Sequence, residues 1–530
     1  FTSFLRYNKY TDRNDGLRQT KEANAMRSVP KEVYALYDKL FRLREEVMTD
    51  GERLFAEWLP HIERRPFRFS ALNLAYYLSV RCHDLRPLQE ELVPLGLSSL
   101  GRSEARTMAN LDAVMATLGR LCGKEDNLID YPSSKWFFHG DRLLAHNTGL
   151  IFGSHAEHHT HIMVTLPTEA ATDYKLVRNL LLAGTDTVRI NCAHDDQTVW
   201  KAMLANLEKA KKETQRDCRI YMDLAGPKIR ISQILFTGDE DKLYNGDTFF
   251  LARGNISDYP ADAAGKIILT CSISIVFSAL KEGDPVLIDD GKLTARVSLI
   301  TEHGAYLTVA ATKEKGFRIK SKKSLNFPDT SLDITPLTKK DLADLDFMIQ
   351  YADSIGYSFV RNADDIRLLQ KELKKRLGKK ASSLAIIAKI ETKDSVKNLP
   401  EIIMQAASKQ PFGVMIARGD LAVEAGYHRL SELQEEILWI CEAAHVPVIW
   451  ATQVLETMVK TGMPTRAEIT DASMSERAEC VMLNKGPYIV KAVSVLVDIL
   501  WRMKQHQYKK AAQLRALNIA IITVKKESSE

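Results

Sequence analysis

The first part of the chain has apolar positions at helical spacing. From Lys31 to Met48 the apolar side chains recur every three or four residues and share one helix face: Val33, Leu36, Leu40, Leu43 and Val47. Residues 100–121 repeat this spacing, with Ser103 as the expected N-cap. The pattern predicts a helical N-terminal extension over residues 1–158. Basic and acidic residues nearly balance there, so we expect it to cover a neighbouring surface; a separate activity is the alternative.

From residue 161 the pattern changes to short apolar runs alternating with amphipathic segments, which indicates βα units and a parallel sheet. The runs number eight: 161–166, 187–191, 219–223, 354–359, 384–390, 413–418, 446–452 and 480–484. Eight such units predict an α/β fold, a (β/α)8 TIM barrel built from residues 159–227 and 325–510. The active site of such a barrel lies at the carboxyl ends of the strands.

Residues 228–324 interrupt the regular spacing between the third and fourth runs. Alternating apolar and polar residues between glycine-rich turns, as in LYNGDTFFLARG, indicate strands of a different kind. We expect a small all-β domain inserted after the third strand, placed to act as a lid. Residues 511–530 are expected to form a C-terminal tail.

Composition narrows the class of protein. The 530 residues are 45% hydrophobic and 27% charged, with a net charge of +5, as in ordinary folded proteins. Basic residues are not clustered with aromatic ones, so no nucleic-acid partner is expected. Seven scattered cysteines without a CxxC pair suit a reducing compartment. No apolar run approaches 18 residues, and the first 15 residues do not resemble a signal peptide, so we expect a cytoplasmic protein with no membrane partner.

Candidate chemistry gathers at the fifth and sixth strand ends. Lys389 and Glu391 are two residues apart in a strand and therefore share a face, and Asp420 follows the next strand. Two carboxylates from adjacent strands suit a hard divalent cation, and a lysine beside them can neutralise charge on a transferring phosphoryl group or an enolate. A buried salt bridge among these three residues is the alternative.

The second and third strand ends carry further polar residues. Arg189, Asn191 and His194 lie in TVRINCAHDD, and Asp223 and Arg230 lie in YMDLAGPKIR. Two arginines and a histidine at one rim suit a polyphosphate, because guanidinium binds phosphate oxygens in a bidentate manner. The same residues could instead anchor surface loops.

Nine segments together resemble the pyruvate kinase family. They are RINCAH, MDLAGPKIR, LIDDGKL, KKSLNFP, YSFVRNADDI, AKIETKD, VMIARGDLAVE, WATQVLETM and PTRAEITD. They occur in the family's order over about 340 of the 530 residues. The resemblance implies transfer of a phosphoryl group from phosphoenolpyruvate to ADP, giving ATP and pyruvate. It also implies a barrel with a β lid, in agreement with the pattern above.

The resemblance also implies roles at matching positions. Glu391 and Asp420 would hold magnesium, with manganese as an alternative, and Lys389 would stabilise the phosphoryl group in transit. Arg189 would contact the transferring phosphate. The residues implied to contact phosphoenolpyruvate are Gly419, Asp420, Thr452 and Ser358, and Thr452 would also lie on the protonation side. The residues implied to contact the nucleotide are His194, Arg230, Lys323 and Asp290.

Two departures from the family concern ions and nucleotides. Ala193 and Leu224 replace a serine and a threonine that usually bind potassium together with Asn191 and Asp223, and Lys228 stands where a glutamate is usual. Because an ammonium group can replace a monovalent cation, we expect that potassium is not required. The loop LNKGPYI after the eighth strand also differs, which puts nucleotide preference in question.

The chain also departs from the family in its architecture. We expect the family's C-terminal effector domain to be absent and the N-terminal extension to provide packing or subunit contacts in a homo-oligomer. Two other functions stay open: a different metal-dependent enolate reaction on an oxo acid or enol phosphate, and a homologue that binds the metabolite without turnover.

Overall fold

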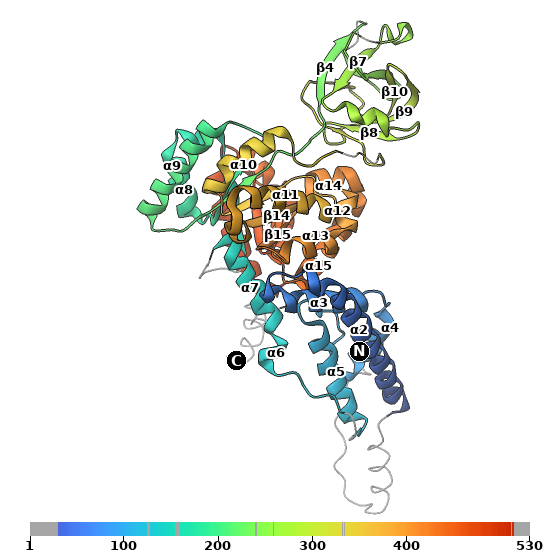
Figure 1. Ribbon diagram of the computed structural model, residues 1–530, viewed down its shortest axis with the longest axis vertical. Coiled ribbons are helices and arrows are strands. Elements are labelled where there is room, and N and C mark those ends of the chain that lie inside the picture. Colours follow the sequence, from blue (N-terminus) through green and yellow to red (C-terminus); the bar gives the residue numbers. More distant parts are fainter. Residues whose placement is uncertain are drawn as a thin grey trace, which may run out of the picture.

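The computed structural model describes residues 30–124, 128–153, 160–238, 241–257, 259–330, 332 and 334–509, together with the backbone of 511–512. Figure 1 shows a group of N-terminal helices, a barrel beside it, and a β module at the far end of the barrel. None of the helices in the described segments combines the length and apolar character needed to cross a lipid bilayer.

The N-terminal helices pack through the apolar face that the sequence predicts. They are α2 (Lys31–Trp58), α3 (Arg68–Val80), α4 (Arg86–Leu92), α5 (Thr107–Leu121), α6 (Ser134–Phe137) and α7 (His139–Phe152). All five predicted apolar positions of α2 are buried. The prediction for Ser103 was wrong: its hydroxyl donates to the Leu100 carbonyl and caps no helix N–H, and α5 begins only at Thr107.

The eight predicted strands form a closed parallel barrel, so the predicted α/β TIM-barrel fold is confirmed. The strands are β1 (His161–Thr165), β2 (Thr187–Asn191), β3 (Arg219–Asp223), β13 (Ser354–Tyr357), β14 (Ala385–Ile390), β15 (Phe412–Ala417), β16 (Val448–Ala451) and β17 (Cys480–Leu483). Strand β1 pairs with both β2 and β17, which closes the ring. Most of their side chains are buried, as continuous apolar runs in a parallel sheet require.

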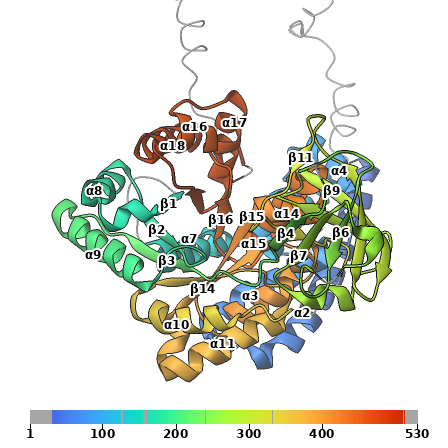
Figure 2. The ribbon, with the colours of Figure 1, turned by 90° about the horizontal axis from the view of Figure 1, so that it is seen from above.

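Helices follow the barrel strands and cover its outside. They are α8 (Tyr174–Ala183), α9 (Gln197–Thr214), α10 (Lys339–Tyr351), α11 (Ala363–Leu377), α12 (Lys393–Lys397), α13 (Leu399–Ala407), α14 (Arg418–Ala425), α15 (Leu430–Ala443), α16 (Glu456–Thr461), α17 (Arg466–Met474) and α18 (Ile489–Met503). A short hairpin of β18 (Gln507–Tyr508) and β19 (Ala511–Ala512) follows α18. Figure 2 shows the strands as a ring with these helices around it.

Helix α7 completes the barrel core from the amino-terminal side of the strands. Ile151 and Phe152, at its end, are buried in one cluster with Met163, Tyr221 and Met415 from the strands. Figure 1 shows α7 running into the barrel from the group of N-terminal helices. The N-terminal helices therefore contribute apolar side chains to the barrel interior as well as covering it.

A buried polar contact joins α3 to the barrel. The ring of His445, which follows α15, lies 2.9 Å from the Ser70 hydroxyl and 3.0 Å from the Ala105 carbonyl. At Gly140 in α7 an added Cβ would lie 1.9 Å from the Ala105 carbonyl oxygen and 2.4 Å from His445, so only glycine fits there. Close packing and hydrogen bonding thus fix the N-terminal helices against the barrel.

The β module lies between β3 and β13, as the sequence predicts. Its strands are β4 (Ile231–Phe236), β5 (Lys242–Leu243), β6 (Thr248–Ala252), β7 (Ile267–Cys271), β8 (Pro285–Ile288), β9 (Leu293–Thr301), β10 (Gly304–Ala311), β11 (Phe317–Arg318) and β12 (Leu325–Asn326). Seven of them form one sheet in the order β12-β8-β9-β10-β6-β7-β4 around a separate apolar core. A bridge between Arg230 and Ser324 brings its two connections to the barrel together.

The His445 contact predicts a pH-dependent stability. Burial lowers the pKa of His445 to about 4 from 6.5, so the unfolded chain binds the proton more readily than the folded one. The free energy of unfolding should therefore fall as the pH is lowered below 6.5, by about 1.4 kcal/mol per pH unit until the folded-state pKa is reached.

Thermal or urea unfolding of the protein and of His445→Gln between pH 7.5 and 5 measures this contribution. The quantity to compare is the slope of the unfolding free energy against pH in the two proteins. Burial raises the pKa of Glu424 and Glu476 to about 7, so these two carboxyls stabilise the fold as the pH falls, opposite to His445. Their contribution is the same in both proteins and cancels in the difference. Equal slopes for the two proteins would contradict the prediction.

Candidate active site

One rim of the barrel carries a network of buried charges. The strands run parallel, so their carboxyl ends meet there, and β2, β3 and β14 contribute Arg189, Asp223 and Lys389. Asp223 and Arg189 are buried, and the Lys389 side chain is 12% exposed. The sequence-predicted residues at these three strand ends therefore do come together.

Asp223 is the centre of this network. Its Oδ2 accepts hydrogen bonds from Arg189 Nε at 3.1 Å and Nη2 at 2.5 Å, and lies 3.6 Å from Lys389 Nζ. Its Oδ1 accepts from the Tyr221 hydroxyl at 3.1 Å. Burial alone raises the pKa of this carboxyl, but the charges of Lys389 and Arg189 outweigh burial and lower the pKa. Asp223 is therefore an ionised counter-charge for two buried cations.

Lys389 is held between three partners. Its ammonium donates to the Ser358 hydroxyl at 2.8 Å and lies 3.0 Å from Glu391 Oε1, in addition to the contact with Asp223. Burial alone lowers the pKa of Lys389, but the charges of Asp223 and Glu391 outweigh burial and raise the pKa above its usual value, so the group stays charged. Ser358 in turn donates to the Leu224 carbonyl at 2.8 Å. A fixed positive charge thus faces the centre of the rim.

Glu391 and Asp420 form the pair of carboxyls that the sequence predicts for a metal. The Phe359 N–H donates to Glu391 Oε2 at 2.6 Å. Burial raises the pKa of Glu391, Lys389 opposes this, and the nearby charge of Asp420 raises it again. One buried and one partly exposed carboxyl that repel one another are a donor set that a hard cation fits, since it would remove their repulsion.

The protein offers few ligands for such an ion. In the described part of the chain, no group of three or more His, Cys, Asp or Glu side chains is gathered as a metal site. A cation held by Glu391 and Asp420 would therefore take its other ligands from substrate or water, as magnesium commonly does at phosphate-binding sites.

Thr452 lies beside Gly419 at the ends of β16 and β15. The Gly419 N–H donates to the Thr452 hydroxyl oxygen at 2.9 Å, and Thr452 has a φ of +66°, a conformation that β-branched residues rarely adopt. Arg418 fixes this turn by donating to the Ala451 carbonyl at 2.8 Å and to the Thr452 carbonyl, and it is paired with Asp471. Arg418 was not among the residues predicted from the sequence, although its place directly before Gly419 was a usable signal.

A cavity opens beside Arg189 on the same rim. It has a volume of about 260 Å³ and is lined in part by Asn191, His194, Lys460 and Lys485. Partial desolvation lowers the pKa of His194, and the positive charge of Lys485 adds to this effect. The lining cations Arg189, Lys460 and Lys485 outnumber the lining carboxyls Asp195 and Glu456 by one, and Lys460 is paired with Glu456, so the cavity has a small excess of positive charge. Sequence analysis noticed the loop LNKGPYI but missed its Lys485, and it missed Lys460 on α16.

Three residues expected near the nucleotide belong to the base of the β module. Lys323 Nζ lies 2.9 Å from Asp289 Oδ1, and Asp290 accepts from the Ser324 hydroxyl at 2.9 Å. Arg230 donates to the Lys322 carbonyl at 3.1 Å. Arg230, Lys323 and Asp290 do not line the cavity that contains His194. The charge of Arg230 nevertheless contributes to the lowered pKa of His194.

Lys228 lies between the barrel and the β module. Its ammonium donates to Asp420 Oδ1 at 2.7 Å and lies 4.0 Å from Asp290 Oδ1. Gly226 positions this segment: its φ is +66°, and a Cβ there would lie 2.8 Å from the Phe359 ring. Asp223 and Asn191, which were expected to lie with Lys228, have other partners. Asp223 contacts Arg189 and Lys389, and the Asn191 side chain accepts from the Ala193 N–H at 3.0 Å.

Comparisons with known proteins agree with this arrangement. The family model described as the barrel domain of pyruvate kinase matches residues 157–493. Pyruvate kinase 2 of Synechocystis sp. is 32% identical over 343 residues, which are 63% of this chain and 55% of that protein. A pyruvate kinase of Agrobacterium vitis is 31% identical over 348 residues, covering 64% of this chain and 68% of that protein. The match thus spans little more than half the length of the Synechocystis relative.

A solved structure shows the same fold. The crystal structure of a pyruvate kinase from Cryptosporidium parvum is similar with a TM-score of 0.59 and 26% sequence identity, covering 72% of this chain and 75% of that chain.

The central role of Asp223 predicts a large loss of stability in Asp223→Ala. Removing this carboxylate leaves the buried charges of Arg189 and Lys389 without their shared partner, which should cost about 3–5 kcal/mol. Asp217→Ala is the matched control, because the Asp217 side chain is 69% exposed and its surface ion pairs should contribute less than about 1 kcal/mol. Urea unfolding of both variants tests this. Similar losses in the two would show that Asp223 does not compensate the buried cations.

Proposed function

Because the chain belongs to the pyruvate kinase family, we propose that it transfers the phosphoryl group of phosphoenolpyruvate to ADP, giving ATP and pyruvate. The observation that carries this proposal is the buried rim network in which Lys389 faces Asp223, Glu391 and Ser358. In the proposed reaction the bond between phosphorus and the enol oxygen breaks, a bond to the terminal phosphate of ADP forms, and the enolate takes up a proton at carbon.

We propose Glu391 and Asp420 as the residues that hold a divalent cation, magnesium or alternatively manganese. Their hard oxygen atoms and mutual repulsion support this assignment. When bound, the ion supplies positive charge to the oxygens of the reacting substrate.

Lys389 and Arg189 are proposed to stabilise the phosphoryl group as it moves. Phosphoryl transfer depends chiefly on positioning and on fixed positive charge, because negative charge is spread over the phosphoryl oxygens in the transition state. Arg189 is fixed by Asp223 on one side and donates from Nη1 to the Thr165 hydroxyl at 3.1 Å. Such a preorganised pair of cations needs little rearrangement during the reaction.

Thr452 and Gly419 are proposed to receive the substrate carboxylate. Their mutual hydrogen bond brings a hydroxyl and a backbone N–H to one point beside Asp420, where an anion can replace the internal contact. The Asp420 backbone N–H and Ser358 complete the proposed substrate contacts. We assign the Thr452 hydroxyl to the side from which the enolate is protonated.

The positively charged cavity beside Arg189 is proposed to hold the phosphates of the nucleotide. His194, Lys460 and Lys485 line it and support this assignment. Arg230, Lys323 and Asp290 would reach the nucleotide from the base of the β module, which requires the module to approach the rim.

The first test is pyruvate formation from phosphoenolpyruvate and ADP in the presence of magnesium. Lys389→Met should reduce kcat by about 10²–10³-fold or more, since it removes a fixed charge from the transition state. Lys397→Met is the matched control, because Lys397 is exposed at the end of α12, and it should leave the rate unchanged. Equal rates for the two variants would contradict the role of Lys389. Calorimetric binding of both substrates without turnover would instead identify a non-catalytic homologue.

A second test concerns potassium. We propose that the ammonium of Lys228 replaces this ion, so the rate should be the same in sodium, tetramethylammonium or potassium chloride. Lys228→Ala should lose activity and regain part of it in potassium, because the site then lacks a positive charge beside Asp420. A steep rise of the wild-type rate in potassium would contradict the proposal.

A further inference from the structure

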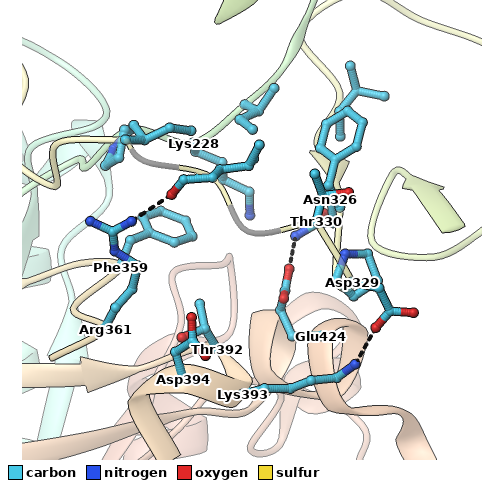
Figure 3. Close-up of a pocket in the computed structure, with 17 residues that line it drawn as sticks. Lys228, Asn326, Asp329, Thr330, Phe359, Arg361, Thr392, Lys393, Asp394 and Glu424 are labelled. Carbon is cyan, nitrogen blue, oxygen red and sulfur yellow. Dashed lines mark hydrogen bonds and ion pairs between the residues drawn. The ribbon is translucent and has the colours of Figure 1, made fainter. Parts of the chain in front are cut away.

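A cavity of about 270 Å³ lies beside the rim, apart from the residues that the proposed reaction uses for phosphoenolpyruvate and nucleotide. Its walls come from both connections of the β module, residues 227–229 and 325–330, and from the barrel turns that contain Phe359 and Thr392. Figure 3 shows Glu424 pointing from the barrel side toward Asn326 on the return connection. The volume is near the lower end for small-molecule pockets.

The cations of this cavity are already neutralised. Three of them line it, each with a carboxylate partner: Lys228 with Asp420 at 2.7 Å, Lys393 with Asp329 at 2.7 Å and Arg361 with Asp365 at 3.3 Å. Two further lining carboxyls, Glu424 and the exposed Asp394, have no ion-pair partner among the residues that the structure describes. The unbalanced charge of the cavity is therefore negative.

Asn326 leaves a hydrogen-bond acceptor without a donor beside Glu424. The Asn326 amide nitrogen donates to the half-buried Glu424 Oε1 at 3.3 Å, which is a long contact. Asn326 Oδ1 is buried and has no hydrogen-bond donor within the described structure. A buried acceptor without a hydrogen bond costs free energy, so a ligand with N–H groups would be favoured here.

The remaining walls are apolar and aromatic. Phe327, Leu332, Ile334 and Phe359 line the cavity together with Pro328. Aromatic ring faces attract cations, and the aliphatic side chains favour a hydrocarbon body. The cavity therefore combines an acceptor pair for a cationic head with an apolar wall for the rest of a small molecule.

We propose that this cavity binds a small organic ammonium ion, a protonated primary amine with a short apolar group. The ammonium donates to Glu424 and to Asn326 Oδ1, and the apolar group packs against Phe327 and Phe359. Because the walls include both connections of the β module, the ligand holds the module and the barrel together at the place where the chain passes between them. The contacts that favour this ligand do not rest on the proposed phosphoryl transfer.

Calorimetry with benzylamine tests the proposal directly. Benzyl alcohol and phenylacetate have the same ring with a neutral and an anionic head, and both should bind at least about tenfold more weakly, since hydrogen bonds to charged groups are the stronger ones. Glu424→Gln should weaken benzylamine binding by a similar factor. Glu401→Gln, an exposed carboxyl on α13, is the matched control and should bind like the wild type.

The pH dependence adds a second readout. Burial raises the pKa of Glu424 to about 7, and an ammonium ion binds the ionised carboxylate better, so affinity should rise from pH 6 to pH 8 and then level off. The groups that act on the pKa of Glu424 are Asn326 through its hydrogen bond, and Asp420, Lys393 and Asp329 through their charges. The rise should disappear in Glu424→Gln.

Hydrogen exchange in the wild type locates the site without any variant. Benzylamine should slow exchange in the backbone amides of 325–327, which belong to the return connection. The proposal is overturned if benzylamine fails to bind, if benzyl alcohol binds equally well, if Glu424→Gln binds as the wild type does, or if protection appears elsewhere and not in this segment.

Discussion

The arrangement of the rim depends on one buried carboxylate with two cationic partners. Asp223 compensates both Arg189 and Lys389, and these side chains extend the network to Thr165 on β1 and to Ser358 after β13. Residues from several strands are therefore fixed relative to one another by charge, in a place where desolvation makes each unpaired charge expensive. Asp223 is the counter-charge that Arg189 and Lys389 share, and Glu391 provides a second one for Lys389.

The fold could be predicted from sequence because barrel strands are local features. Each strand is a short apolar run buried on both faces, and each shows its pattern without knowledge of its neighbours. Ser103 was placed wrongly because a serine before an apolar helix is a common cap signal, whereas here its hydroxyl bonds to a nearby carbonyl and the helix starts later. The packing of Ile151 inside the barrel was not predictable, since it depends on contacts with residues hundreds of positions away.

In the site, too, local features could be predicted from the sequence and tertiary contacts could not. Lys389 and Glu391 were expected to share a face because strand geometry fixes residues two apart, and they lie 3.0 Å from each other. The partner of Lys228 depends on how the connection to the β module bends at Gly226, which no local pattern specifies. Lys485 and Lys460 contribute to the cavity beside Arg189 through tertiary packing; the loop that holds Lys485 was noticed in the sequence, but neither lysine was singled out. The roles assigned to these residues stay predictions.

Closure of the barrel by β1 and β17 has a consequence for biosynthesis. These two strands are neighbours in the sheet but about 300 residues apart in the chain. At common rates of translation a ribosome needs about 15–60 s to synthesise that length. During this interval one edge of β1 lacks β17, and the apolar end of α7 lacks its later contacts such as Met415. The nascent chain therefore carries an open sheet edge for most of its synthesis, and chaperones have their longest opportunity to act on it before β17 emerges.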